Sequence, residues 1–134
     1  MQTFLPHVNF ARAASVLDYR RLGKQRVEAK QILKALHIPG YGWKNHPAVT
    51  MWRGYEDALC LYYNTIIDEW VRRGYRNNMV TIALDLKTVV LPPWLGDESF
   101  HASHRSNLLR KDPTFYSQYG WSEPDDLPYV WPLV

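Results

Sequence analysis

Residues 18–36 carry the clearest amphipathic pattern in the chain and read DYRRLGKQRVEAKQILKAL. At 3.6 residues per turn, one stripe of this segment is apolar and consists of Leu22, Ala29, Leu33 and Leu36, with Ile32 beside it. A second stripe, about a third of a turn away, is polar and consists of Arg21, Lys24, Glu28 and Gln31. The pattern therefore predicts a helix with one face for a core and another on which a single carboxylate lies among cations.

The polar face has two interpretations. In the first it is a solvated surface, on which a Lys24–Glu28 pair one turn apart contributes about 0.2–0.5 kcal/mol. In the second it is a functional site built around the carboxylate. Gly23, in the interior of the same helix, weakens it by about 1 kcal/mol relative to Ala, and this indicates close approach by another group.

Length and composition indicate one globular domain over residues 1–134, because 46% of the residues are hydrophobic and 22% are charged. Aromatic residues, at 14%, either fill a core or offer flat faces on which bases stack. Cys60 is the single cysteine, so we expect a buried thiol and no disulfide framework. The sequence has no signal-peptide pattern and no run that could cross a bilayer, and we expect a cytoplasmic protein.

Charge is distributed unevenly along the chain. Residues 1–44 carry a net charge of +6 and residues 101–111 a net charge of +3, whereas residues 45–100 and 112–134 carry −2 and −4. Two basic segments separated by neutral or acidic ones predict one basic face if the two segments meet in space. A phosphate backbone is the commonest partner of such a face, although solubility alone also explains a modest one.

Capping residues predict the other elements. Asn9 caps a short helix over 10–17, and a long helix begins at Pro47 and ends near Gly74, with Gly54 as a point of interruption. A further helix is expected over 98–111 and a short one over 113–119. Residues 79–86 suit a short helix and 88–91 an extended run, and the tail from residue 121 is predicted to pack as an extended strap rich in aromatic residues and proline.

Few motifs of familiar chemistry are present. His101 and His104 share a helix face, but a zinc site needs a third ligand, and candidates such as Glu28 are remote in sequence. There is no phosphate-binding Gly-rich loop after a strand, no nucleophile elbow and no Cys–His signature. A basic helix carrying Glu28, a second basic helix and many aromatic residues together favour handling of nucleic acid. A helical protein with a basic side remains the alternative.

Three stretches resemble the pyrimidine-dimer DNA glycosylases, whose best-known member is phage endonuclease V. They are Tyr19-Arg20-Arg21-Leu22 with Arg26, His46 followed by a helix ending Arg72-Arg73-Gly74-Tyr75, and Pro113-Thr114-Phe115-Tyr116 with Tyr119-Gly120. The chain is most similar to a bacterial branch of that family. The branch is marked by Leu22-Gly23-Lys24-Gln25-Arg26-Val27-Glu28, by Asn45-His46-Pro47-Ala48-Val49 and by residues 103–111, SHRSNLLRK.

The resemblance implies a compact all-α fold of three principal helices with short connecting helices. It also implies a DNA repair enzyme, a glycosylase and abasic-site lyase that works on double-stranded DNA without metal or cofactor. In this family the α-amino group of the first residue attacks the anomeric carbon of the sugar, expels the base and forms a Schiff base that permits β-elimination. Such an amine has a pKa near 7.7–8.0, so a useful fraction is neutral at pH 7.

Two positions depart from the family pattern. The family begins with a small residue exposed by removal of methionine, whereas here Met1 precedes the bulky Gln2, so Met1 supplies the amine, or Thr3 after other processing. Arg21 stands where the family keeps a glutamate. Glu28 lies two turns further along the helix, at nearly the same angle but roughly 10 Å along the axis.

These considerations give a set of expected roles. Met1 is the expected nucleophile and Glu28 the carboxylate. The expected phosphate contacts are Arg20, Arg21, Lys24, Arg26, His104, Arg105, Arg110 and Lys111. Tyr41 and Trp43, on a glycine-flanked loop, are expected to stack on a base or, alternatively, to anchor the loop on the core.

We expect a monomer that needs no membrane and no obligate protein partner. Two alternative functions stay open. The first is a non-catalytic nucleic-acid-binding protein on the same fold, with Arg21 in place of the catalytic acid. The second is a metal-dependent hydrolase that uses His101, His104 and Glu28.

Overall fold

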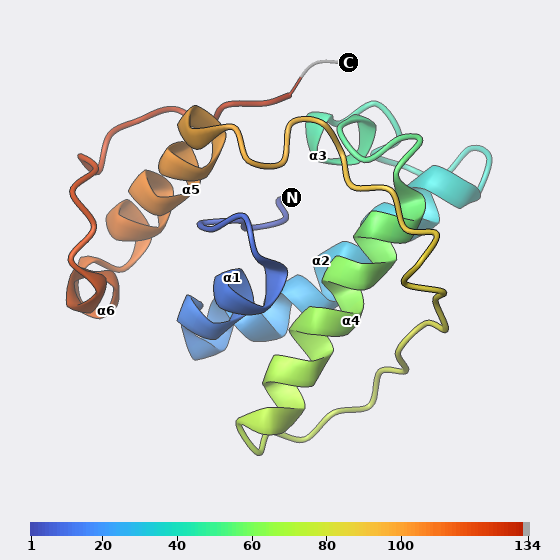
Figure 1. Cartoon of the computed structure of the whole chain (residues 1–134), viewed down its shortest axis with the longest axis horizontal. Helices are drawn as coiled ribbons and strands as arrows, with labels where there is room; N and C mark the ends of the chain where they lie inside the picture. Colours follow the sequence, from blue (N-terminus) through green and yellow to red (C-terminus); the bar gives the residue numbers. More distant parts are fainter. Residues whose placement is uncertain (133–134) are drawn as a thin grey trace.

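The computed structural model describes residues 1–132, which form helices and connecting segments and contain no strand. Figure 1 shows the arrangement. The elements are α1 (Phe10–Val16), α2 (Tyr19–His37), α3 (Pro47–Thr50), α4 (Glu56–Arg72), α5 (Glu98–Lys111), α6 (Pro113–Tyr116) and the 3₁₀ turn η1 (Ser117–Tyr119). The predicted all-α fold with three principal helices, α2, α4 and α5, is confirmed. No helix in this part of the chain is long and apolar enough to cross a membrane.

Helix α2 packs along α4 with the apolar stripe that its sequence predicts. Leu22, Ala29 and Ile32 are fully buried, and Leu33 is nearly so. Gly23 lies directly against the Trp70 side chain of α4, because a Cβ at this position would lie 2.9 Å from Cζ3 of Trp70. The expected close approach at Gly23 is therefore confirmed, and Cys60 is buried on α4 as expected.

The predicted helix over 47–73 is two helices. A turn separates α3 from α4, and Gly54 occupies it with a φ of +86°, a left-handed conformation that glycine adopts without strain. The expected short helix over 79–86 is absent. Side chains of α4 bind the backbone there: Asn64 pairs with both the N–H and the C=O of Ile82, and the Tyr63 hydroxyl donates to the Val80 carbonyl. These bonds take backbone groups that a helix would have used internally.

The two ends of the described chain come close together beside α5, where the ring centroids of Phe4 and Tyr129 are 6.4 Å apart. The tail after Gly120 runs along α5 without regular secondary structure through residue 132, as the predicted strap (Figure 1). Side chains of Ser103, Ser106 and Asn107 bind its backbone at 127 and 130. The first six residues enter the middle of the molecule, between α5 and the α2–α4 pair.

Candidate functional site

Residues 2–6 form a buried extended segment that has no partner strand, so its backbone groups bind side chains. On the side of α2 and α4, the Phe4 N–H donates to Oε1 of Gln25 at 2.9 Å, and Nε2 of Gln25 donates to the Gln2 carbonyl at 3.0 Å. The hydroxyl of Tyr62 donates to the Phe4 carbonyl at 2.8 Å. These contacts satisfy groups that would otherwise be buried without a partner.

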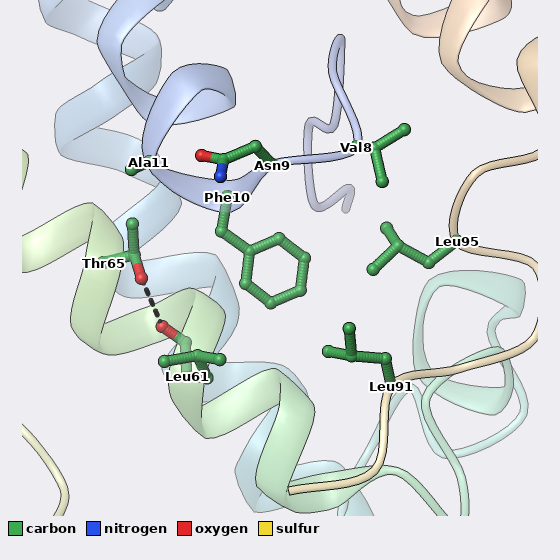
Figure 2. Close-up of a pocket in the computed structure, with 8 residues that line it drawn as sticks. All are labelled: Val8, Asn9, Phe10, Ala11, Leu61, Thr65, Leu91 and Leu95. Atoms are coloured by element: carbon green, nitrogen blue, oxygen red, sulfur yellow. Dashed lines mark hydrogen bonds between the residues drawn. The ribbon is translucent and has the colours of Figure 1, made fainter. Parts of the chain in front are cut away.

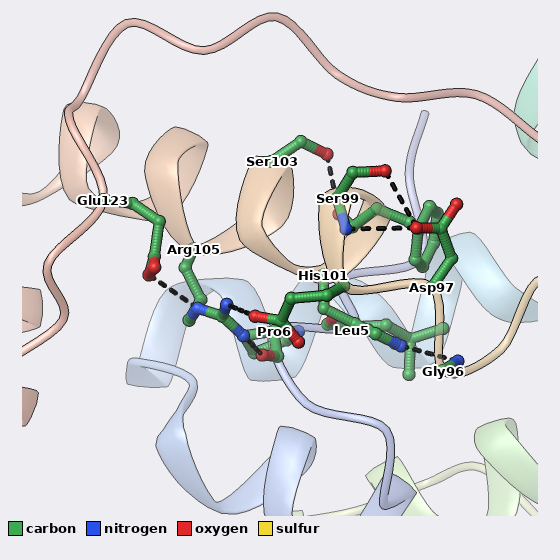
Figure 3. A network of polar contacts seen from close by, with 11 residues as sticks. Leu5, Pro6, Gly96, Asp97, Ser99, His101, Ser103, Arg105 and Glu123 are labelled. Atoms are coloured by element: carbon green, nitrogen blue, oxygen red, sulfur yellow. Dashed lines mark hydrogen bonds and ion pairs between the residues drawn. The ribbon is translucent and has the colours of Figure 1, made fainter.

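On the opposite side, α5 holds the same segment. The Leu5 N–H donates to Nδ1 of His104 at 2.9 Å, and Nδ1 of His101 donates to the Leu5 carbonyl at 2.7 Å. Arg105 donates to the Pro6 carbonyl at 2.7 Å and to Glu123 at 2.6 Å, and it also pairs with Glu98 (Figure 3). The chain start is thus fixed between α2, α4 and α5.

Both histidines are neutral in this arrangement. Nε2 of His101 accepts from the Gly96 N–H at 3.0 Å, so its only proton is on Nδ1 (Figure 3). Nδ1 of His104 is an acceptor, so the proton of its neutral ring is on Nε2, which has no partner among the described residues. Burial lowers the pKa of His101, and burial lowers the pKa of His104 to about 3.

The fixed chain start opens into a pocket of about 340 Å³. Its lining combines the first residue, the polar face of α2, the end of α5 and the strap, and consists of Met1, Gln2, Phe4, Arg20, Arg21, Lys24, Gln25, Glu28, Lys111 and Tyr129. Met1 and Glu28, which the sequence predicts as partners, line the same pocket. The polar face of α2 is therefore the wall of a cavity.

Glu28 is half-buried in this pocket, and burial raises the pKa of its carboxyl. The N-terminal amine, then Lys24, a hydrogen bond from Gln25 and finally Lys111 act in the opposite direction without overcoming burial. Nε2 of Gln25 donates to Oε2 of Glu28 at 2.8 Å. A carboxylate with a raised pKa beside an amine and cations has the properties of a proton-transfer group.

Of the predicted phosphate contacts, Arg20, Lys24 and Lys111 are exposed and line the pocket. Arg21 also lines it, but its guanidinium pairs with Asp18 at 3.1 Å. Arg26 and Arg110 lie outside the lining. Arg26 stacks over the Trp70 ring at 4.2 Å and bonds Asn77, and Arg110 bonds Asn107.

The structure corrects the phosphate roles predicted for His104 and Arg105. His104 is 0% exposed and its Nδ1 binds Leu5, so it cannot reach a phosphate. Arg105 is buried, with its donors taken by Pro6, Glu98 and Glu123. The alternative of a metal-dependent hydrolase needs His101 and His104 as metal ligands, but both side chains are buried and bind the backbone of Leu5. No cluster of three potential ligands lies within residues 1–132.

The loop that carries Tyr41 and Trp43 lies outside the pocket lining. Trp43 is 62% exposed and has a φ of +74°, whereas Tyr41 is partly buried against the core. The loop ends at His46, whose Nδ1 accepts from the Ala48 N–H and caps α3. Burial lowers the pKa of His46 and the N-terminal amine adds to this, so the end of the loop lies near the pocket.

A second pocket, of about 460 Å³, lies between α1, α4 and residues 91–95 (Figure 2). Its lining is mainly apolar. The two polar side chains in it, Asn9 and Thr65, are already bonded to Arg12 N–H and to the Leu61 carbonyl. This pocket has no group for catalysis, whereas the pocket of Met1 and Glu28 combines an amine, a carboxylate and cations and is the candidate site.

Sequence reasoning missed Gln25, Phe4 and Tyr129 as parts of the site. The sequence contains one signal for Gln25. On the helix this residue lies at the border between the apolar and polar stripes, and a polar side chain that is buried there needs hydrogen-bond partners. Phe4 and Tyr129 gave none, since each reaches the pocket through contacts between segments remote in sequence.

The fold thus brings the start of the chain, the Glu28 carboxylate and several cations to the lining of one pocket. The sequence model described as pyrimidine dimer DNA glycosylase matches residues 1–83, and the chain belongs to this family. The matched part contains Met1, Glu28 and α1–α4. Neither the curated proteins nor the solved structures gave a match.

Proposed function

We propose that the chain is a DNA glycosylase and abasic-site lyase that acts on damaged double-stranded DNA, with pyrimidine dimers as the candidate lesion. The Met1 amine is the nucleophile and Glu28 is the carboxylate that assists it. The observation that carries this proposal is that Met1 and Glu28 line one pocket, with Arg20, Lys24 and Lys111 on the same lining. Membership of the glycosylase family supports it.

The reaction begins when the neutral amine attacks C1′ of the damaged nucleotide, and the bond from C1′ to the base breaks. Opening of the sugar ring, with a proton delivered to its oxygen, gives an imine between Met1 and C1′. Removal of a proton from C2′ then expels the 3′ phosphate by β-elimination, and water finally releases the sugar fragment from the amine. A carboxylate beside the imine stabilises its positive charge and moves these protons.

Glu28 suits both roles because burial raises the pKa of its carboxyl, so the group gains and loses a proton more readily near neutral pH than an exposed glutamate. Arg21, at the position of the family glutamate, is paired with Asp18. In this proposal Glu28 replaces that glutamate from two turns further along α2, since the pocket extends along the helix from Arg20 to Glu28.

DNA is held by the cations of the lining. Arg20, Lys24 and Lys111 are exposed, and none of the three forms an ion pair with a described residue, so all are free to contact phosphates. Trp43, exposed on its loop, is the candidate for stacking on a base. Arg110 adds positive charge near Lys111, whereas Arg26 is held by Trp70 and Asn77 outside the lining.

The test is borohydride trapping on two duplexes, one with a single abasic site and one irradiated with ultraviolet light. We expect a covalent adduct on both, and peptide mapping should locate it at Met1. N-terminally acetylated protein is the control and should give no adduct. An adduct that maps to a lysine, or that survives acetylation, would show that the chemistry does not use the chain start.

The second candidate is a non-catalytic DNA-binding protein. Arg21 at the position of the family glutamate favours it. Binding to both duplexes with a steep salt dependence, and no adduct on either, would select this candidate.

A further inference from the structure

We propose that Gln25 is a positioning residue that fixes the Met1 amine and the Glu28 carboxylate relative to each other. This inference rests on the proposed function, because it concerns the same pocket. Gln25 itself does not contact the reacting atoms in the proposed chemistry. It acts through the two groups that do.

The amide of Gln25 uses all of its hydrogen-bonding positions. It is 1% exposed. Nε2 donates to the Gln2 carbonyl at 3.0 Å and to Oε2 of Glu28 at 2.8 Å. Oε1 accepts from the Phe4 N–H at 2.9 Å, and it lies 2.7 Å from the Tyr62 hydroxyl, whose single proton it shares with the Phe4 carbonyl. The Phe4 N–H beside Oε1 and the two acceptors beside Nε2 fix the orientation of the amide, since a flipped amide would face like groups.

These bonds join the two halves of the site through one side chain. The Gln2 carbonyl lies one residue after the amine, and the bond to Glu28 reaches only one of its carboxylate oxygens. The other oxygen, Oε1, accepts no bond from residues 1–132 and is left for a substrate. Reacting groups need to be held to within about 0.5 Å, and a misplacement of about 1 Å can cost about 100-fold in rate.

The decisive variant is Gln25→Glu, which keeps the size and both acceptor positions but removes the donors. A carboxylate at this position faces Glu28, so we expect the pKa of Glu28 to rise further. The other charged and titratable groups facing Glu28 are the Met1 amine, Lys24 on α2, Tyr62 on α4, Lys111 at the end of α5 and Tyr129 on the strap.

We expect Gln25→Glu to slow imine formation on the abasic duplex by about 100-fold at pH 7.5. The deficit relative to the wild type at the same pH should shrink toward pH 5, because a protonated carboxyl at position 25 again donates a hydrogen bond. Affinity for a duplex with a non-reactive tetrahydrofuran site should stay within about twofold, since Arg20, Lys24 and Lys111 are untouched.

Asn64→Asp is the matched control. Asn64 also holds two backbone groups with its amide, those of Ile82, but it lies outside the pocket lining. The Asn64→Asp variant should have a lower thermal stability than the wild type, but the pH dependence of its borohydride trapping should be unchanged. If Gln25→Glu keeps the wild-type pH profile and loses activity only in proportion to its stability, as Asn64→Asp does, the positioning role is overturned.

A measurement without DNA separates this inference from the proposed function. Acetylation of Met1 removes its charge, so the pKa of Glu28, followed by carbon NMR of the carboxyl, should rise in the wild type. In Gln25→Met the rise should be less than half as large, because the two groups are no longer held together. An equal rise in both proteins would refute the inference. Wild-type protein that forms no adduct would refute only the proposed chemistry.

Discussion

Among single residues, Glu28 carries the sharpest expectation. Glu28→Gln keeps the shape of the side chain but removes its charge and its capacity to move protons. We expect imine formation on an abasic duplex to fall by about 100-fold or more, while DNA affinity is kept or increases because a negative charge leaves a cationic pocket. Trapping rates and titration with a tetrahydrofuran duplex measure the two effects. Asp68→Asn, on the exposed side of α4, should change neither.

His104 gives a prediction about acid stability. Its pKa is lowered to about 3 by burial, against about 6.5 in an unfolded chain, so the unfolded state binds the proton more tightly. Its contribution to stability is therefore complete above pH 6.5 and is lost as the pH falls toward 3. Between pH 7 and pH 5 this amounts to about 2 kcal/mol of the free energy of unfolding.

His104→Asn should remove most of that dependence, because its side-chain oxygen can still accept from the Leu5 N–H but does not titrate. Urea unfolding at pH 7 and pH 5 measures the difference in both proteins. A variant that loses as much stability between these two pH values as the wild type would contradict the assignment to His104. His7, whose pKa burial lowers to about 4, contributes to both proteins equally.

At the scale of elements, the contact of α2 with α4 predicts an unusual effect on stability when Gly23 is replaced by alanine. Gly→Ala inside a helix normally stabilises it by about 1 kcal/mol. At Gly23 the added methyl would meet Trp70, whose ring is held by stacking on Tyr19 and by the bond from its Nε1 to the Arg76 carbonyl. We expect Gly23→Ala to lower the free energy of unfolding by about 1–2 kcal/mol, because overpacking costs more than the helix gains.

A double-mutant cycle checks the cause of that loss. Trp70→Phe removes the outer ring atoms that the methyl would meet, so Gly23→Ala should be neutral or stabilising in the Trp70→Phe background. Urea unfolding of the four proteins gives the coupling energy. If the glycine substitution costs the same in both backgrounds, the close approach to Trp70 is not its cause.

For the molecule as a whole, the separate basic segments of the sequence meet at one pocket, to which α2 contributes Arg20 and Lys24 and α5 contributes Lys111. We expect DNA affinity to fall steeply with salt. Arg20→Gln should reduce the slope of log affinity against log salt concentration by about 1. Lys87→Gln, in the segment between α4 and α5, removes an equal charge outside the pocket lining and should leave the slope unchanged.

Local patterns predicted much of this structure, and contacts between remote residues account for the rest. Capping residues and periodicity predict the helix over 98–111 and the buried stripe of α2. The polar stripe of α2 indicates Glu28 as a candidate because it is a lone carboxylate among cations. The phosphate contacts predicted for His104 and Arg105 are wrong because a basic helix has the same sequence pattern whether its side chains face DNA or a buried segment. Leu5 and His104 are 99 positions apart, and no local pattern encodes their contact.

That separation also orders events while the chain is being made. The first residues leave the ribosome early, but α5, which binds Leu5 and Pro6, is synthesised about a hundred residues later. At 5–20 residues per second the interval is roughly 5–20 s. Throughout it the chain start has no partner on that side and is open to enzymes that trim or modify new proteins. An enzyme that acts on this segment during that interval therefore meets it before the pocket around it exists.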